Sequence, residues 1–244
     1  MNASVRNNSQ GRKPEGFICL HVDGPYMAGS PEFQKRGLAK IRKDFNAVGS
    51  EDKNDIMFVG QQIKWKNHEK FGSYISCDQK LEVDQLEEIK VEKHMKDNMP
   101  CSPSMHTAYR SVLGQLNWLQ SRTQCHIRYR FSRCASAAAK PTIADAREIN
   151  KTVPTLKSQY IDGRFWPVKG PQRIVGMPDA SYRNNADKSS QRAHVLFIAE
   201  DRKIGRQGHK GEHKVNTRGS VVDYESHKIT TKLNLLLLQN IMHL

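Results

Sequence analysis

A short apolar run that ends in a tight turn is the feature that most constrains the fold of this chain. Residues 17–22 can form a strand, and Asp23-Gly24-Pro25 supplies the dihedral angles of a reversal. A second apolar stretch, Tyr26-Met27-Ala28, completes a β-hairpin with Asp23 at its tip. A carboxylate at a hairpin tip can meet a metal ion, but Asp-Gly is also a common plain turn. Both interpretations stay open from these residues alone.

A helix is expected directly after the hairpin. Ser30 can cap it, Pro31 suits its first turn, and Glu32 favours the positive end of the helix dipole. The apolar residues that follow are spaced by five, three and four positions, and removal of Gly37 would restore a regular helical stripe. The spacing therefore predicts that Gly37 turns Phe33 away from the buried face. The stripe consists of Phe33, Leu38, Ile41 and Phe45.

The remaining elements alternate between strand and helix patterns. Strands are expected over 56–65 and 73–77, and a helix over 79–96 with Leu81, Leu86 and Ile89 facing inward. A proline-containing linker at 98–106 precedes three helices, the last of which begins near Thr142 and should kink or end at Pro154. Three antiparallel strands should follow between 173 and 229. The aromatic residues of the helices have core spacing, although they could also stack on bases; they are Trp118, Tyr129 and Phe131.

Several of these segments, taken in order, resemble the reverse transcriptases of copia-type retrotransposons. His21-Val22-Asp23-Gly24 is similar to the Tyr-Val-Asp-Asp box of that family, and Ala28-Gly29 to the Ala-Gly that follows it. Phe58-Val59-Gly60-Gln61-Gln62-Ile63 resembles the family's Phe-Leu-Gly-x-x-Ile strand. The other similar segments are 72–80, Tyr109-Arg110-Ser111-Val112-Leu113-Gly114, 122–127 and Phe131-Ser132-Arg133.

A further set of segments resembles the start of the family's ribonuclease H domain. These segments are Asp179-Ala180-Ser181-Tyr182, Ser189-Ser190-Gln191-Arg192, Val195-Leu196-Phe197-Ile198 and the strand 220–229. The resemblance implies that Asp179 is the first catalytic carboxylate of that domain. It also implies an α+β fold: a partial reverse-transcriptase palm, a helical connection, and a truncated ribonuclease H-like antiparallel sheet. The expected boundaries are 1–16 for a disordered N-terminus, 17–99 for the partial palm, 100–165 for the helical connection and 166–244 for the truncated ribonuclease H-like domain.

The departures from the family predict that both catalytic centres are incomplete. Two-metal phosphoryl transfer needs clustered carboxylates around Mg²⁺ or Mn²⁺. The second Asp of the family's box is replaced here by Gly24, and the chain lacks the fingers and the first palm strand with its Asp. No Asp or Glu follows Glu225, so Asp179 lacks its expected partners as well. We expect a remnant polymerase and ribonuclease H with incomplete metal sites at Asp23 and Asp179. Reconstitution by a second chain is disfavoured by Gly24.

The charge of the chain favours a polyanionic partner. There are 39 Lys and Arg residues against 25 Asp and Glu, which gives a formal net charge of +14. Such an excess promotes weak, non-specific binding to nucleic acid, including an RNA/DNA hybrid, through phosphate contacts. The densest basic run should be a loop that either contacts a nucleic-acid backbone or is only solvated. Its cationic residues are Arg202, Lys203, Arg206, Lys210 and Lys214.

Cysteine and hydropathy patterns exclude several other classes of protein. The five cysteines are scattered without any Cys-x-x-Cys pair, which argues against a disulfide framework and a structural zinc site; the neighbours Cys125 and His126 have no second ligand pair. The N-terminus has no apolar signal segment, and no apolar run approaches the length of a membrane span. An intracellular location, cytoplasm or nucleus, is therefore expected.

The C-terminal residues 232–244 have an unusual leucine-rich sequence. Apolar side chains surround most of the expected helix, so leucines should stay exposed and favour self-association. The alternative is a helix that covers one face of the sheet. The abrupt change to leucine-rich sequence suggests a frameshifted or truncated reading frame.

Two functions from different classes remain. The first is a catalytically inactive retrotransposon remnant that binds nucleic acid. The second is a basic interaction module without nucleic-acid chemistry, built from a helical bundle over 107–160. Binding to a primer–template duplex across a salt series separates them.

Overall fold

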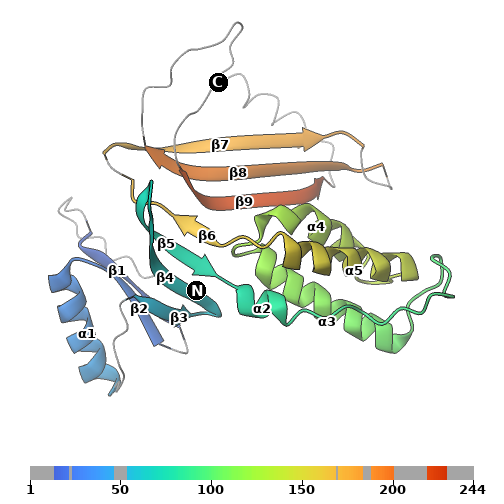
Figure 1. Cartoon of the computed structure of the whole chain (residues 1–244), viewed down its shortest axis with the longest axis horizontal. Coiled ribbons are helices and arrows are strands. Elements are labelled where there is room, and N and C mark those ends of the chain that lie inside the picture. Colours follow the sequence, from blue (N-terminus) through green and yellow to red (C-terminus); the bar gives the residue numbers. More distant parts are fainter. Residues whose placement is uncertain are drawn as a thin grey trace, which may run out of the picture. The chain divides into compact units, whose positions relative to one another are not determined.

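The structure is a computed structural model that describes residues 14–21, 24–46, 54–168, 170–183, 188–200 and 219–229. The chain forms two compact units, residues 1–65 and 66–244. Figure 1 shows α-helices and antiparallel sheets in the same chain, so the α+β class is confirmed. The family-level fold and the four expected segment boundaries stay predictions.

The first unit begins with the expected hairpin and helix. Strand β1 (Gly16–His21) pairs antiparallel with β2 (Gly24–Gly29), with Cys19 opposite Tyr26. Helix α1 (Pro31–Phe45) follows, and the Ser30 hydroxyl accepts a hydrogen bond of 3.2 Å from the backbone N–H of Phe33. The cap predicted from the sequence is therefore confirmed. None of the described side chains in this unit is fully buried, so its core is thin.

The prediction for Gly37 was wrong. An added Cβ at Gly37 would lie 3.1 Å from the Met27 sulfur, and one at Gly16 would lie 2.5 Å from the Phe33 ring. Phe33 and Gly37, one helical turn apart, therefore both face the hairpin. The residue that leaves the stripe is Phe45, which is 69% exposed. Gly37 allows close approach of the helix instead of rotating Phe33 away.

The expectation of one strand over 56–65 was wrong, because a strained turn at 59–60 divides this stretch into a second hairpin. Strand β3 (Asp55–Phe58) pairs antiparallel with β4 (Gln61–His68), which crosses the boundary between the two units. The two turn residues, Val59 and Gly60, have φ of 50° and 62°. Positive φ at both central positions is typical of a type I′ turn, which favours Asn-Gly. A β-branched residue is strained in this conformation.

We predict that Val59→Asn stabilises this hairpin, because asparagine tolerates positive φ better than valine does. Amide hydrogen exchange at Phe58 and Gln61 should slow by about two- to fivefold, since relief of left-handed strain is worth on the order of 1 kcal/mol. Val59→Ala is the control, because alanine retains the Cβ and should gain less. Equal or faster exchange in Val59→Asn would contradict the strain.

The second unit has its core among three helices. These are α3 (Pro103–Gln120), α4 (Arg128–Ser136) and α5 (Ile143–Ser158), with a short 3-10 helix η1 (Cys125–Ile127) before α4. Tyr109 is fully buried, and its hydroxyl donates a hydrogen bond of 2.7 Å to the backbone carbonyl of Cys134. The fully buried apolar side chains packed around it include Leu116, Ala146, Ile149 and Leu156.

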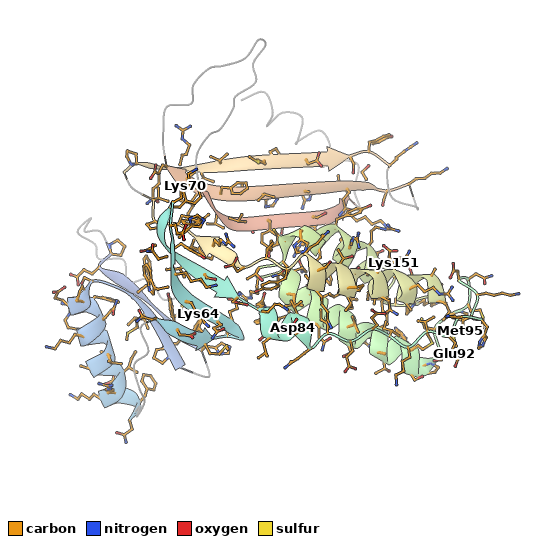
Figure 2. The ribbon with its side chains drawn as sticks, viewed as in Figure 1. Lys64, Lys70, Asp84, Glu92, Met95 and Lys151 are labelled. Carbon is orange, nitrogen blue, oxygen red and sulfur yellow. The ribbon has the colours of Figure 1, made fainter. Side chains whose placement is uncertain are left out.

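The helix expected over 79–96 is much shorter. Helix α2 spans only Lys80–Asp84, and Leu81 is 62% exposed. The following segment is not helical, although Leu86 and Ile89 are buried as expected. Figure 2 labels Asp84 at the end of α2, and Glu92 and Met95 along this segment.

Side chains of α5 replace the helical hydrogen bonds of this segment. The Asn150 amide accepts from the Ile89 N–H at 2.8 Å and donates to the Ile89 carbonyl at 2.7 Å. Lys157 donates to the Leu86 carbonyl at 2.8 Å, and Arg147 to the Met95 carbonyl at 2.8 Å. The apolar spacing identifies two of the buried residues, but polar partners outside the segment determine its backbone conformation.

Two other expectations about this region need correction. The predicted linker 98–106 is tied to the bundle: the Cys101 N–H donates to the Pro141 carbonyl, and α3 already begins at Pro103. Pro154 lies inside α5, which continues to Ser158, so the expected end of the helix at Pro154 was wrong, while a kink there stays a prediction. The three helices themselves are confirmed.

Three long antiparallel strands complete the second unit, as expected. They are β7 (Gln172–Ser181), β8 (Ser190–Glu200) and β9 (Gly219–Ile229), with β8 in the centre. Figure 1 shows β9 beside α4. Gln191 of β8 donates to Ser132 of α4 at 3.4 Å and to Ser226 of β9 at 2.8 Å, which joins the sheet to the helices. The short strands β5 (Gly72–Asp78) and β6 (Gly163–Phe165) pair with each other.

We predict that Tyr109→Phe lowers the unfolding free energy of the second unit by about 0.5–1.5 kcal/mol, because a buried hydrogen bond is lost while the Cys134 carbonyl still accepts from the Ala137 N–H. Urea denaturation followed by circular dichroism measures this change. Tyr129→Phe on the exposed side of α4 is the matched control and should change the free energy by less than about 0.5 kcal/mol. Equal effects of the two substitutions would contradict the role of the hydroxyl.

Candidate nucleic-acid interface

Asp179, the predicted ribonuclease H carboxylate, has no other carboxylate opposite it on its face of the sheet among the described residues. It is exposed in β7, and the residues opposite it are Ala193 in β8 and then Ser226 in β9. Asp223 and Glu225 occupy β9 positions that point to the other face, because successive residues of a strand alternate. The described residues contain no group of three His, Cys, Asp or Glu able to hold a metal. They therefore do not fit a two-metal centre at Asp179.

The other predicted site residues lie outside the described part of the chain. These residues are Asp23, Arg202, Lys203, Arg206, Lys210 and Lys214. The leucine-rich tail, and with it the expected self-association, also falls outside this part. A nucleic-acid interface within the described part of the chain would therefore consist of other residues.

Residues 121–133 form an arginine-rich segment that the sequence analysis did not single out for its charge. It contains four arginines and no Asp or Glu. Ile127 and Cys134 are buried in the helical core and fix η1 and α4 in place. Arg130 and Arg133 are exposed, and Tyr129 between them and Arg128 is 38% exposed. The signal that could have revealed the segment is local charge, since 103–158 has nine Lys and Arg against two Asp and Glu.

The stacking candidates of the sequence analysis separate in the structure. Phe131 packs against the core, as its helical spacing predicts. Trp118 is half-buried, and the guanidinium of Arg122 lies over its ring at 4.8 Å. Tyr129 is the exposed aromatic of the segment, so it is the one of the three that a base could reach.

Arg122 and Arg128 are the inward members of the segment. The buried Nε of Arg122 has no hydrogen-bond partner among the described residues. Arg128 donates a hydrogen bond to the side-chain oxygen of Gln120, and the Gln120 backbone carbonyl accepts one from the Tyr224 hydroxyl. The end of α3 is therefore held between α4 and β9. Burial and the nearby Arg130 lower the pKa of His126, which favours its neutral form.

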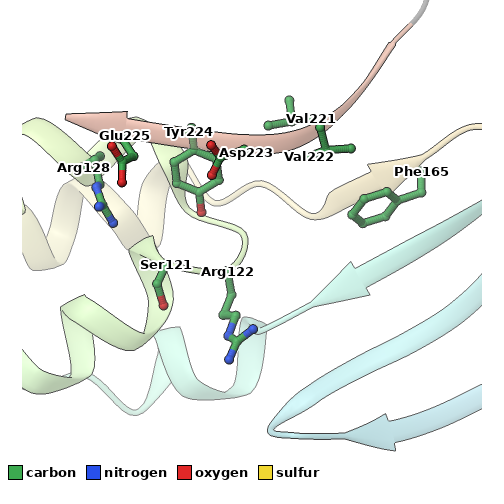
Figure 3. Close-up of a pocket in the computed structure, with 9 residues that line it drawn as sticks. All are labelled: Ser121, Arg122, Arg128, Phe165, Val221, Val222, Asp223, Tyr224 and Glu225. Carbon is green, nitrogen blue, oxygen red and sulfur yellow. The ribbon is translucent and has the colours of Figure 1, made fainter. Parts of the chain in front are cut away.

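A pocket of about 240 Å³ lies between this segment and β9. Figure 3 shows Ser121, Arg122 and Arg128 on the helical side and the labelled residues of β9 above them, with Phe165 to one side. The full lining consists of Ser121, Arg122, Arg128, Phe165, Val221, Val222, Asp223, Tyr224 and Glu225. The lining thus includes two arginines, Tyr224 and several apolar residues, whereas the side chains of Asp223 and Glu225 point to the face of β9 opposite Tyr224.

The carboxylates of Asp223 and Glu225 are each paired with a histidine on their own face of the sheet. His194 Nε2 is 2.9 Å from an Asp223 oxygen, and His227 Nε2 is 3.2 Å from a Glu225 oxygen. The hydrogen bond from His227 holds the pKa of Glu225 below its ordinary value, against the opposing effect of burial. Glu225 is therefore a carboxylate at neutral pH and can only accept hydrogen bonds.

No family model matches the chain, and no match was found among curated proteins or solved structures. None of the helices in the described ranges is long and apolar enough to cross a membrane. The candidate interface therefore rests on the geometry of the second unit.

We predict that Asp179→Asn changes neither folding nor metal binding. The free energy of unfolding should shift by less than about 0.5 kcal/mol, because the side chain is an exposed surface group. Titration calorimetry with Mg²⁺ should give the same heats for both proteins. A saturable Mg²⁺ site that disappears in Asp179→Asn would contradict the isolation of this carboxylate.

Proposed function

We propose that this chain is a remnant of a copia-type retrotransposon polymerase and ribonuclease H that binds nucleic acid without catalysing a reaction on it. The observation that carries the proposal is the placement of Arg122 and Arg128 in one pocket, with Arg130 and Arg133 exposed on the same short helix as Arg128. Arginine is suited to this role because its planar guanidinium can bind a phosphate through two hydrogen bonds.

Electrostatics supports a polyanionic partner more broadly. The helical region 103–158 has a formal charge of +7, half of the net +14 of the chain, within 56 residues. Binding would release counterions from the nucleic acid and so depend steeply on salt. Tyr129 adds an exposed aromatic ring among these cations, and stacking on aromatic rings is a common sequence-independent contact with bases.

We infer no catalysis by this chain, because the carboxylates needed for it are not gathered. Gly24 replaces the second aspartate of the family's hairpin, and Asp179 has Ala193 and Ser226 opposite it. Two-metal chemistry needs several carboxylates around both ions. Mg²⁺ or Mn²⁺, which the resemblance implies, therefore has no role in the binding proposed here.

We predict that the chain binds an RNA/DNA hybrid duplex with an affinity that falls steeply with salt. Fluorescence anisotropy between 50 and 200 mM salt gives the slope of log K against log salt. Arg122→Gln/Arg128→Gln should reduce that slope by about 0.9 for each phosphate that is no longer neutralised. Lys140→Gln/Lys151→Gln removes the same charge elsewhere and is the matched control. An equal decrease in both variants would show non-specific attraction without an interface at the arginines.

We further predict that the chain neither extends a primer nor cuts the RNA strand of a hybrid in Mg²⁺ or Mn²⁺. Gel analysis of labelled strands measures both reactions. Metal-dependent cleavage that is abolished in Asp179→Asn would contradict the assignment of a non-catalytic role.

A second candidate function is a basic interaction module that does not contact nucleic acid. The compact helical core around Tyr109 favours it, because this part of the chain has the properties of an independently packed bundle. The salt series distinguishes the two candidates: this alternative predicts no measurable affinity for the hybrid at 150 mM salt.

A further inference from the structure

The apolar side of the pocket beside β9 lies at an irregularity of the sheet. The register shifts between Leu196 and Phe197 of β8, and Val222 is the extra residue of β9 at this point. Such a β-bulge changes the direction of the side chains around it. Val222 is 46% exposed, and Phe165 of β6, which lines the same pocket, is 39% exposed. The bulge and β6 together therefore leave an apolar surface open to solvent.

Both neighbouring strands hold Phe165 beside this bulge. The backbone N–H of Trp166, the next residue, donates a hydrogen bond of 2.9 Å to the buried Ser220 hydroxyl of β9. Phe165 itself lies opposite Ile75 of β5. Figure 3 shows the Phe165 ring turned toward the labelled residues of β9. The ring is therefore fixed at one end of the pocket by its backbone.

The cations of the pocket lie on the helical side. Figure 3 shows Arg122 and Arg128 at two different points there, with the Tyr224 ring between them in this view. Burial raises the pKa of Tyr224 well above its ordinary value, and the positive charges of Arg128 and Arg122 oppose that rise. The side chains of Asp223 and Glu225 point to the other face of β9. The side of β9 that faces the helices therefore keeps the positive charge of the arginines.

Both guanidinium groups retain donors for a ligand. Arg128 donates to the side chain of Gln120, but a guanidinium has five N–H groups. The guanidinium of Arg122 lies over the Trp118 ring at 4.8 Å, and its buried Nε has no hydrogen-bond partner in the described part of the chain. Stacking on the indole orients the plane of the guanidinium and leaves the N–H groups at its edge available to an anion.

An aromatic ring at one end and cations on the helical side suit an unpaired nucleotide. A phosphate alone would use only the arginines. In a duplex the neighbouring bases cover each other's faces, so Phe165 would have no base surface to stack on. The base of an unpaired nucleotide can stack on Phe165 while the phosphates on either side of it reach Arg122 and Arg128.

The size of the pocket limits it to one base. Its volume of about 240 Å³ lies just below the roughly 300–1,000 Å³ that is typical of pockets for drug-sized ligands. Every base has a π-face, so stacking on a phenylalanine does not select among the bases. On the basis of the proposed nucleic-acid binding, we infer that the pocket takes one unpaired base of a single strand against Phe165, whichever base it is, with neighbouring phosphates at Arg122 and Arg128.

Anisotropy titrations at 150 mM salt with labelled strands of 12 residues test this inference. The strands are oligodeoxythymidine, a fully abasic strand, and the abasic strand with one central thymine or one central adenine. All four carry the same phosphates. Oligodeoxythymidine should bind about tenfold more tightly than the abasic strand, which is the low end of the gain from one base stacked on an aromatic side chain. Each single base should restore about a threefold gain, because only one register places it in the pocket. No gain from either single base would contradict the inference.

Substitutions of Phe165 test where the base stacks. Phe165→Ala should remove the gain from bases and leave binding to the abasic strand unchanged, because the arginines remain. Tyr182→Ala is the matched control: it removes a ring that is 67% exposed and does not line the pocket, and it should keep the full gain. A folding defect would weaken binding to the abasic strand as well. Phe165→Leu then decides, because leucine fills the apolar volume without a ring and should retain only a small part of the gain.

The outcomes separate this inference from the proposed function. If all four strands bind equally and Arg122→Gln/Arg128→Gln weakens them all, the inference is wrong and the proposed function stands. If neither the strands nor the hybrid duplex bind, the proposed function fails and the inference fails with it. A gain from bases that survives both substitutions of Phe165 would overturn the inference, and its loss in Tyr129→Ala would place the stacked base on α4 instead.

Discussion

The buried contact between α3 and α4 is the interaction on which the candidate interface depends. Tyr109 is fully buried, and its hydroxyl donates to the Cys134 carbonyl, which fixes the end of α4 against α3. Burial and nearby acidic groups raise the pKa of Tyr109 well above its ordinary value, so the hydroxyl keeps its proton. Because α4 begins with Arg128, this contact also determines where the arginine meets β9. The stability of the core and the geometry of the pocket are therefore linked.

Local patterns predicted most of the elements in this chain. The cap at Ser30, the first hairpin, the three helices and the three long strands all follow from short-range signals. Those signals fail where distant polar groups decide the conformation. The amide of Asn150 pairs with both backbone groups of Ile89 and makes a non-helical segment favourable where apolar spacing indicated a helix. The prediction for Gly37 failed for a related reason, because a close approach between elements leaves no trace in the periodicity of one helix.

The candidate site was less predictable than the fold. The resemblance directed attention to Asp179, and the register of the sheet places Ala193 and Ser226, but no other described carboxylate, opposite it. The pocket instead joins Arg122 and Arg128 to Tyr224 of β9, which is about 100 residues away in the sequence. Pairing of such distant residues depends on how β9 packs beside α4. The residues themselves were visible in the sequence, but their proximity was not.

Photo-crosslinking tests the central claim of nucleic-acid binding at this interface most directly. A single-stranded oligonucleotide with 4-thiouridine at each position in turn is irradiated with the full chain, and the attached peptides are identified by mass spectrometry. The account predicts crosslinks in the segment 121–133 and in β9, which an excess of unlabelled strand should suppress. Specific crosslinks confined to other parts of the chain, with none in these two segments, would contradict it.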